Sequence, residues 1–273
     1  MFSDKSDPNI VKHTPRVSAL KEIDCRATYN LGKSFRNILE SQKTSIEASL
    51  GKKLWLKSSD LHSVFLDLAL IISRINEDGT KVNRREELFE IIHDRHWTDE
   101  EEREYENLGF GVNCLLFDVK SLLINITIYM DVLAKFLSLC IKSNRQPRNR
   151  SFERFRKDLK NYRGPEIEVL KRIVNEYATW YDEIKNLRDD FIIHHPAGRH
   201  ALEFFDGIAH IPLTTTKKEY NHGHIIDGAI AKSLSIEKID STLSQLKILL
   251  TELNKYLTEK INAIPFKAEY YEP

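Results

Sequence analysis

The sequence predicts an all-α protein, a helical bundle with a short irregular or β-hairpin segment near residues 201–228. Along most of the chain, apolar residues recur at intervals of three and four, which is the spacing of one face of an α-helix. Glycine and proline are few, at 10 and 8 of 273 residues, whereas an all-β fold needs many turns. β-Prone residues coincide with turn signals only between Ala201 and Gly228.

Length and composition indicate a globular chain with one principal domain. The chain is 41% hydrophobic and 30% charged, which is ordinary for such proteins. We expect residues 1–16 to form a loose tail and residues 17–273 to form a single helical domain. Lysine plus arginine equals aspartate plus glutamate, at 41 each, so the chain is not a general polyanion binder. Any nucleic-acid role must rest on a local patch.

Helical spacing predicts the elements of the N-terminal half. It runs from Val17 to about Leu50, then over 60–75, with a short third helix expected at 86–92. Thr98 then opens the tetrapeptide TDEE, a capping box in which Glu101 lies three residues on. We therefore expect a helix to begin directly after Thr98.

The segment from Phe110 to Ile141 is the longest apolar stretch. It is apolar nearly all round, which predicts a central position in the bundle. A membrane span is not expected, because charged and amide side chains interrupt the stretch. These are Asp118, Lys120, Asn125, Asp131 and Lys135.

A basic run follows, between Lys142 and Arg163. It holds nine Lys or Arg residues and two acids, a local excess of seven positive charges. It is either a solvated loop or a track for RNA, with interleaved aromatic residues able to stack on bases. For the RNA interpretation, the candidate contacts are Arg148, Arg150, Arg154 and Arg156.

Two further helices are expected in the C-terminal half. The first runs from Glu166 to about Phe191 and should end before Pro196, which disfavours helical geometry in the residue before it. The second begins at Ser235, a good N-cap residue. Its apolar seam is Ile236, Ile239, Leu243, Leu246, Leu250, Leu253 and Leu257.

Polar residues replace apolar ones at the end of the helix from Glu166, in the stretch NLRDDFIIHHPAGRH. Continued past Ile184, the spacing of three and four reaches Arg188, Phe191 and His195. Positions seven apart differ by only about 20° in direction on a helix, so Arg188 and His195 would share a face. His194 continues the other edge of the stripe. Burying a guanidinium there is costly without a partner. Asp189 or Asp190 could pair with it, although adjacent residues point apart on a helix. Alternatively, the stripe ends at a solvent-filled cleft that needs a cation.

The stretch LRDDFIIHH resembles the motif of the HEPN domains (higher eukaryotes and prokaryotes nucleotide-binding). That motif is an arginine, a polar residue, and a histidine after four to six intervening residues. Arg188 and Asp189 supply the first two. His194 fits with five intervening residues and His195 with six. The resemblance covers a core of about residues 110–196.

The resemblance implies a metal-independent endoribonuclease, in which two motifs meet in one cleft of a homodimer. A histidine would take the 2′-OH proton and a histidine would protonate the 5′-oxygen. Arg188 would stabilise the charged phosphorane, and Asp189 would orient Arg188 or a histidine. RNA would be the substrate. Family habit adds a role in antiphage defence or as a toxin, with an antitoxin or regulatory protein as partner.

Other interpretations remain open. The chain could be a catalytically silent HEPN-like module that binds RNA or nucleotide, or a helical scaffold. His194 and His195 could simply stabilise a helix C-terminus, and Arg188 could pair with Asp118 or Asp131 on the central helix. Zinc is not expected at His200, His210, His222 and His224, because no cysteine or nearby carboxylate completes a ligand set. We expect no cofactor. Three scattered cysteines and a polar N-terminus favour the cytoplasm.

Overall fold

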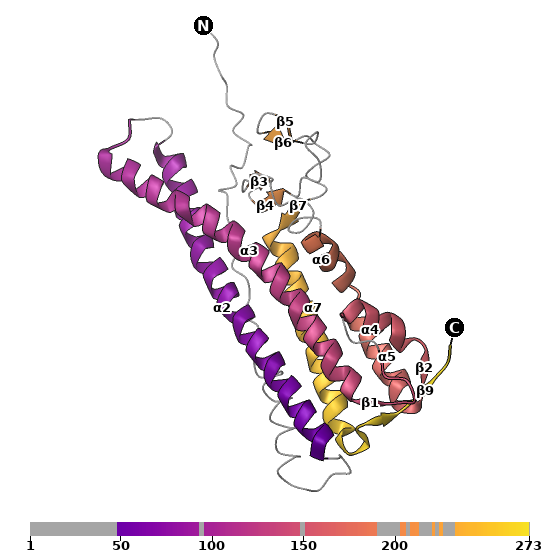
Figure 1. Cartoon of the computed structure of the whole chain (residues 1–273). Helices are drawn as coiled ribbons and strands as arrows, with labels where there is room; N and C mark the ends of the chain where they lie inside the picture. The colour runs from indigo at the N-terminus through magenta and orange to yellow at the C-terminus, as the bar shows by residue number, and fades with distance from the viewer. Residues whose placement is uncertain are drawn as a thin grey trace.

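The computed structural model describes residues 48–92, 96–147, 151–189, 203–205, 208–212, 220–221, 224–225 and 233–272. Within these residues the protein is a helical bundle with a few short strands, which confirms the predicted fold class (Figure 1). Three long helices, α2 (Ala48–Ile92), α3 (Asp99–Leu139) and α7 (Ile236–Glu259), form its length. The tail expected at 1–16 and nearly all of the helix expected from Val17 lie outside the described residues.

Helix α2 is continuous for 45 residues, so the prediction of separate helices at 60–75 and 86–92 is wrong. The polar stretch between them stays helical because it packs on α3. Val82 is fully buried there. Arg84 Nε contacts Glu104 of α3 at 3.1 Å, and Lys81 pairs with Glu77 one turn away at 2.9 Å. Tertiary packing and ion pairs outweigh the weak local preference.

Helix α3 begins where the capping box predicts. Thr98 Oγ1 accepts the Glu101 N–H at 3.3 Å, and the Glu101 carboxylate accepts the Thr98 N–H at 3.0 Å. The apolar helix therefore starts at Asp99, eleven residues before the apolar stretch itself. By length and composition α3 could cross a membrane, but 61% of its most apolar window is buried within the protein. It is the central helix of the bundle (Figure 1).

Three short helices pack on the flank of the bundle: α4 (Phe152–Leu159), α5 (Pro165–Tyr177) and α6 (Tyr181–Arg188). The single helix predicted over 166–191 is therefore wrong, since the chain leaves helical geometry at Ala178–Trp180. Two side chains bind the carbonyls at this break: Trp180 Nε1 donates to Tyr177 O at 2.8 Å and Arg156 Nη1 donates to Ala178 O at 3.2 Å. The apolar stripe of the predicted helix is still buried, except at Tyr177 and Leu187, which are partly exposed. Its residues are Ile167, Leu170, Ile173, Val174, Tyr177, Trp180, Tyr181, Ile184 and Leu187.

Helix α7 follows the sequence prediction closely. Ser235 Oγ accepts the Lys238 N–H at 3.2 Å, and every residue of the predicted seam is buried. The core to which the seam belongs includes side chains of α2, α3, α4, α5 and α6.

The expected β-hairpin is present within 201–228. Strand β3 (Glu203–Phe205) pairs antiparallel with β4 (Ile208–Pro212), and β4 pairs with β7 (Ser233–Ser235). A second antiparallel pair joins β5 (Tyr220–Asn221) to β6 (His224–Ile225).

The C-terminal segment ties the short helices to α3. After the 3₁₀ turn at Ile261–Ala263, β8 (Phe266–Lys267) pairs with β1 (Ile141–Lys142), and β9 (Glu269–Tyr270) pairs with β2 (Tyr162–Arg163). Gly164 adopts φ 153°, and a Cβ there would lie 2.7 Å from Lys267 O. Only glycine fits this approach of the two chain segments.

Candidate functional site around Arg188

Helix α6 carries the candidate arginine at its C-terminal end. Tyr181 and Ile184 are buried against the core, and Arg188 follows Ile184 by four residues on the same face. The Arg188 side chain is 22% exposed, so it lies at the edge of the core, partly open to solvent. The arginine therefore continues the apolar line, as the sequence predicts. Residues 190–202, which include His194 and His195, lie outside the described residues.

Arg188 is paired with the residue that follows it. Its Nε donates to Asp189 Oδ1 at 2.8 Å, and its Nη2 contacts the same oxygen. Asp189 was one of the partners considered for Arg188, and the pair forms although helical neighbours point apart, because the long arginine side chain can reach back to a carboxylate at the helix end. A cation held in this way keeps the outward donors of its planar guanidinium for another acceptor.

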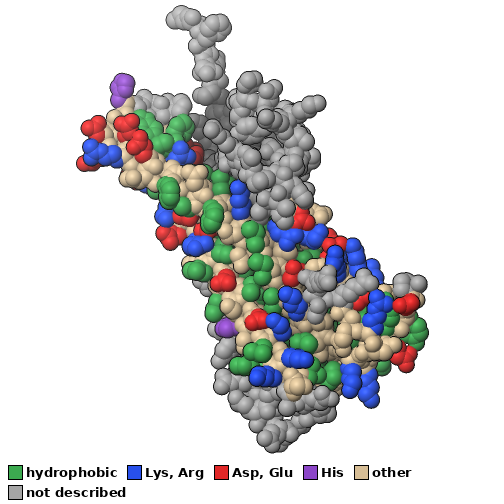
Figure 2. Space-filling view, viewed as in Figure 1, with side chains coloured by type: hydrophobic (Ala, Val, Ile, Leu, Met, Phe, Trp, Pro, Cys, Tyr) green, Lys and Arg blue, Asp and Glu red, His purple; other side chains and the backbone are tan. Residues whose placement is uncertain are grey.

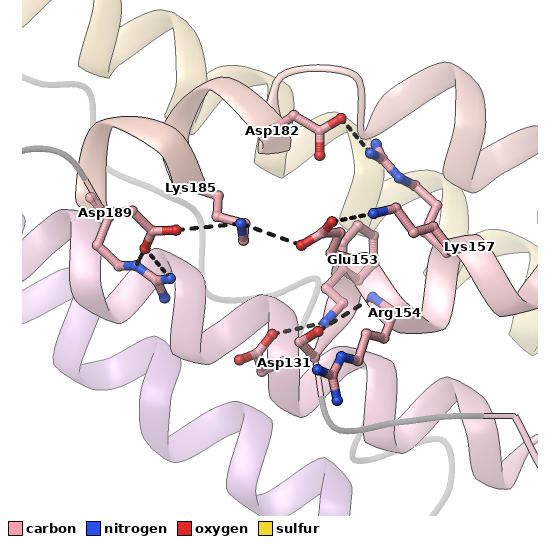
Figure 3. Close-up of polar contacts among 11 residues, drawn as sticks. Asp131, Glu153, Arg154, Lys157, Asp182, Lys185 and Asp189 are labelled. Carbon is pink, nitrogen blue, oxygen red and sulfur yellow. Dashed lines mark hydrogen bonds and ion pairs between the residues drawn. The ribbon is translucent and has the colours of Figure 1, made fainter. Parts of the chain in front are cut away.

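Asp189 is part of a chain of charges that crosses from α6 to α4 (Figure 3). Lys185 Nζ lies 3.3 Å from Asp189 Oδ2 and 3.3 Å from Glu153 Oε2, and Glu153 also contacts Lys157. Burial by itself would raise the pKa of Asp189, but Arg188 and Lys185 outweigh it and the pKa is lowered. The Lys157 hydrogen bond lowers the pKa of Glu153. Both carboxylates are therefore ionised at neutral pH.

Asp131 brings a further acid from α3 to this region. Its Oδ1 accepts the backbone N–H of Phe152, the first residue of α4, at 2.8 Å. Burial raises the pKa of Asp131, while that hydrogen bond and the nearby charge of Arg188 act in the opposite direction. The other acid considered as a partner for Arg188, Asp118, binds Arg74 instead. Arg188 thus has Asp189 as its direct partner and Asp131 close by.

The predicted RNA contacts have different surroundings. Lys and Arg side chains gather on the flank that carries the short helices (Figure 2). Arg154 is exposed there. Arg156 is only 17% exposed, and its guanidinium binds Asp182 and Ala178 O. Arg148 and Arg150 lie outside the described residues. Arg154 therefore has the exposure that a nucleic-acid contact needs, whereas Arg156 serves the fold.

Sequence reasoning named Asp131 as a candidate partner but missed three residues of this cluster: Glu153, Asp182 and Lys185. Part of the signal was in the spacing, because Asp182, Lys185 and Asp189 follow one another by three and four residues on one face of a helix. Their partners on α4 come from a separate element, and no local pattern identifies them.

The described residues contain no group of three or more His, Cys, Asp or Glu side chains arranged to hold a metal. Of the four histidines weighed as zinc ligands, His200 and His222 lie outside the described residues.

Comparison of the chain with protein-family models, curated proteins and solved structures finds no match.

Proposed function

We propose that this protein is a metal-independent endoribonuclease of the HEPN type. The observation that carries the proposal is the environment of Arg188. The side chain lies at the end of a helix that packs on the core, is 22% exposed to solvent, and is oriented by a hydrogen bond to Asp189, the polar residue that follows it. In the motif that the sequence resembles, that polar residue and a downstream histidine complete the site.

The proposed chemistry divides the work among three residue types. One histidine of the pair His194 and His195 removes the 2′-OH proton, and a histidine protonates the leaving 5′-oxygen, since imidazole titrates near neutral pH. Arg188 stabilises the negative charge that develops on the phosphorane. Asp189 orients Arg188 through the Nε hydrogen bond.

The proposal extends to substrate path and assembly. The exposed Arg154, together with Arg148 and Arg150, would contact the RNA backbone on the α4 flank. Two copies would bring their motifs together in a homodimer. A cytoplasmic location, a role in antiphage defence or as a toxin, and control by an antitoxin or regulatory protein belong to the same proposal.

The test is cleavage of mixed-sequence RNA by purified protein in EDTA. We expect Arg188→Ala to reduce cleavage by about 10²–10³-fold, the usual effect of removing one group that stabilises transition-state charge. Arg188→Lys should rescue little, because an ammonium lacks the planar pair of donors. The double variant His194→Ala, His195→Ala should also be inactive.

Full activity of the histidine double variant would eliminate this mechanism. RNA binding without cleavage by the unsubstituted protein would favour the alternative, a silent HEPN-like module that binds RNA or nucleotide. If the protein neither binds nor cleaves RNA, the remaining interpretation is a helical scaffold, in which the charge cluster only stabilises the end of α6.

A further inference from the structure

The break between α5 and α6 sets the direction of the helix that carries Arg188. Three residues, Ala178 to Trp180, separate the two helices. Trp180 is 6% exposed, and its ring nitrogen donates to Tyr177 O at 2.8 Å. Because the last carbonyls of a helix have no partner within the helix, they need external donors. The break is therefore a defined structure, stabilised by a hydrogen bond from a buried side chain.

Arg156 contacts both sides of this break. Its Nη1 donates to Ala178 O at 3.2 Å, at the end of α5, and its Nη2 pairs with Asp182, in the first turn of α6. One planar guanidinium thus fixes the end of one helix relative to the start of the next. A lysine could make one of these contacts but lacks the rigid fork that makes both.

Helix α4 also contacts α6 at a second point, one turn further along α6. Glu153 of α4 pairs with Lys185 at 3.3 Å, and Lys185 reaches Asp189, also at 3.3 Å. Figure 3 shows Asp182, Lys185 and Asp189 along the side of α6 that faces α4. The contacts from α4 therefore extend to the carboxylate that holds Arg188.

Helix α4 is itself firmly anchored. Phe152 and Phe155 are fully buried, and the Phe152 ring packs edge-on against Tyr181 of α6, with ring centroids 4.9 Å apart. Asp131 of α3 accepts the Phe152 N–H. A helix fixed to the core in this way can hold its neighbour in a defined orientation.

We propose that Arg156 is a positioning residue: it clamps the α5–α6 break and so aims Arg188, acting through α6 and without touching RNA. Its role in catalysis rests on the proposed ribonuclease function. The basic residues of α4 then have two separate roles: Arg156 orients Arg188, and the exposed Arg154 contacts the RNA.

The experiment compares Arg156→Lys and Asp182→Asn with Arg172→Ala, the removal of an exposed arginine on α5 that serves as the control. Three signals are measured: cleavage kinetics, Trp180 fluorescence in a Trp55→Phe, Trp97→Phe background, and the NMR signal of the Arg188 Nε–H group. Asp182 is 53% exposed, so its replacement keeps the fold while it removes half of the clamp.

We expect both clamp variants to lower kcat by roughly 10- to 100-fold, the effect of a small misplacement of a catalytic group, with KM for RNA nearly unchanged. Trp180 emission should shift to the red, and the Arg188 Nε–H signal should move. Arg172→Ala should change none of the three.

Unchanged Trp180 and Arg188 signals in both clamp variants would overturn the proposal, whatever happens to kcat. So would an unchanged kcat in an active enzyme. If the unsubstituted protein does not cleave RNA, the ribonuclease function fails separately, and the two spectroscopic signals still decide whether Arg156 positions Arg188.

Discussion

Two arginine–aspartate pairs in this protein have different consequences. Arg74 of α2 binds Asp118 of α3 through two separate contacts, Nη2 to Oδ1 at 2.6 Å and Nε to Oδ2 at 3.0 Å, across 44 residues of sequence. Arg188 binds the adjacent Asp189, and both of its donors reach one oxygen. The first pair cross-links two helices, whereas the second connects residues that are already covalent neighbours.

The contrast separates charges that hold the fold from charges that orient a side chain. A contact between sequence neighbours forms almost as easily in the unfolded chain, so it adds little to the free energy of unfolding. Its effect is to fix the direction of the guanidinium. Lys185 links Asp189 to Glu153 of α4, so the direction of the guanidinium is tied to the neighbouring helix.

The sharpest test of this contrast is to remove each arginine and measure stability. Arg74→Ala leaves the Asp118 carboxylate, whose side chain is 6% exposed, without its cation. We expect a loss of about 2 kcal/mol in the free energy of unfolding, since a buried charge that loses its partner keeps its desolvation cost. Arg188→Ala should cost less than about 1 kcal/mol. Urea denaturation followed by circular dichroism measures both.

Equal losses in the two variants would break the comparison, because Arg188 would then be a structural cross-link. As a control, the double variant Arg74→Ala, Asp118→Ala should recover part of the loss, since it leaves neither partner alone in the core.

Asp131 provides a second test, through the pH dependence of stability. Its folded-state pKa is raised, chiefly by burial, so it favours the folded protein in its protonated form. This contribution is fully present below the ordinary aspartate pKa and is lost as pH rises through the raised value. Asp131→Asn should therefore gain stability relative to the unsubstituted protein as pH rises from about 4 to 7. Its amide oxygen can still accept the Phe152 N–H.

Thermal melts across this pH range decide the point. Asp67→Asn, which removes an exposed carboxylate of α2, gives the effect of lost charge alone. If Asp131→Asn instead lost stability relative to the unsubstituted protein as pH rises, the ionised carboxylate would be an essential partner of Arg188.

The smallest expected effect concerns Arg154, the exposed arginine of α4. If it contacts a phosphate, Arg154→Ala should weaken RNA binding and reduce the slope of log affinity against log salt by about one. Fluorescence anisotropy at several salt concentrations measures this slope, with Arg172→Ala as the control. An unchanged slope would return the basic run to a solvated surface and would leave α4 with only its positioning role.

The candidate site was predictable in part. Arg188 and Asp189 stand out because a stripe that is apolar through Ile184 suddenly becomes charged. Their surroundings were not predictable, because the cluster joins residues of α3, α4 and α6. Arg156 is the clearest case: in the sequence it is one of nine cations in a basic run, and in the structure it binds Ala178 and Asp182.

The sequence by itself determined the features that depend on neighbours a few residues apart. Thr98 and Ser235 begin their helices where predicted, and the seam of α7 is buried in full, because capping bonds and helical faces repeat over three or four residues. The tertiary structure alone decided that α2 stays unbroken and that the helix predicted from Glu166 breaks at Ala178. Both outcomes depend on side chains far away in the chain: α3 supports the polar stretch of α2, and Arg156 binds the carbonyl at the break. Local preferences are worth only fractions of a kcal/mol per residue, so packing and long-range hydrogen bonds override them.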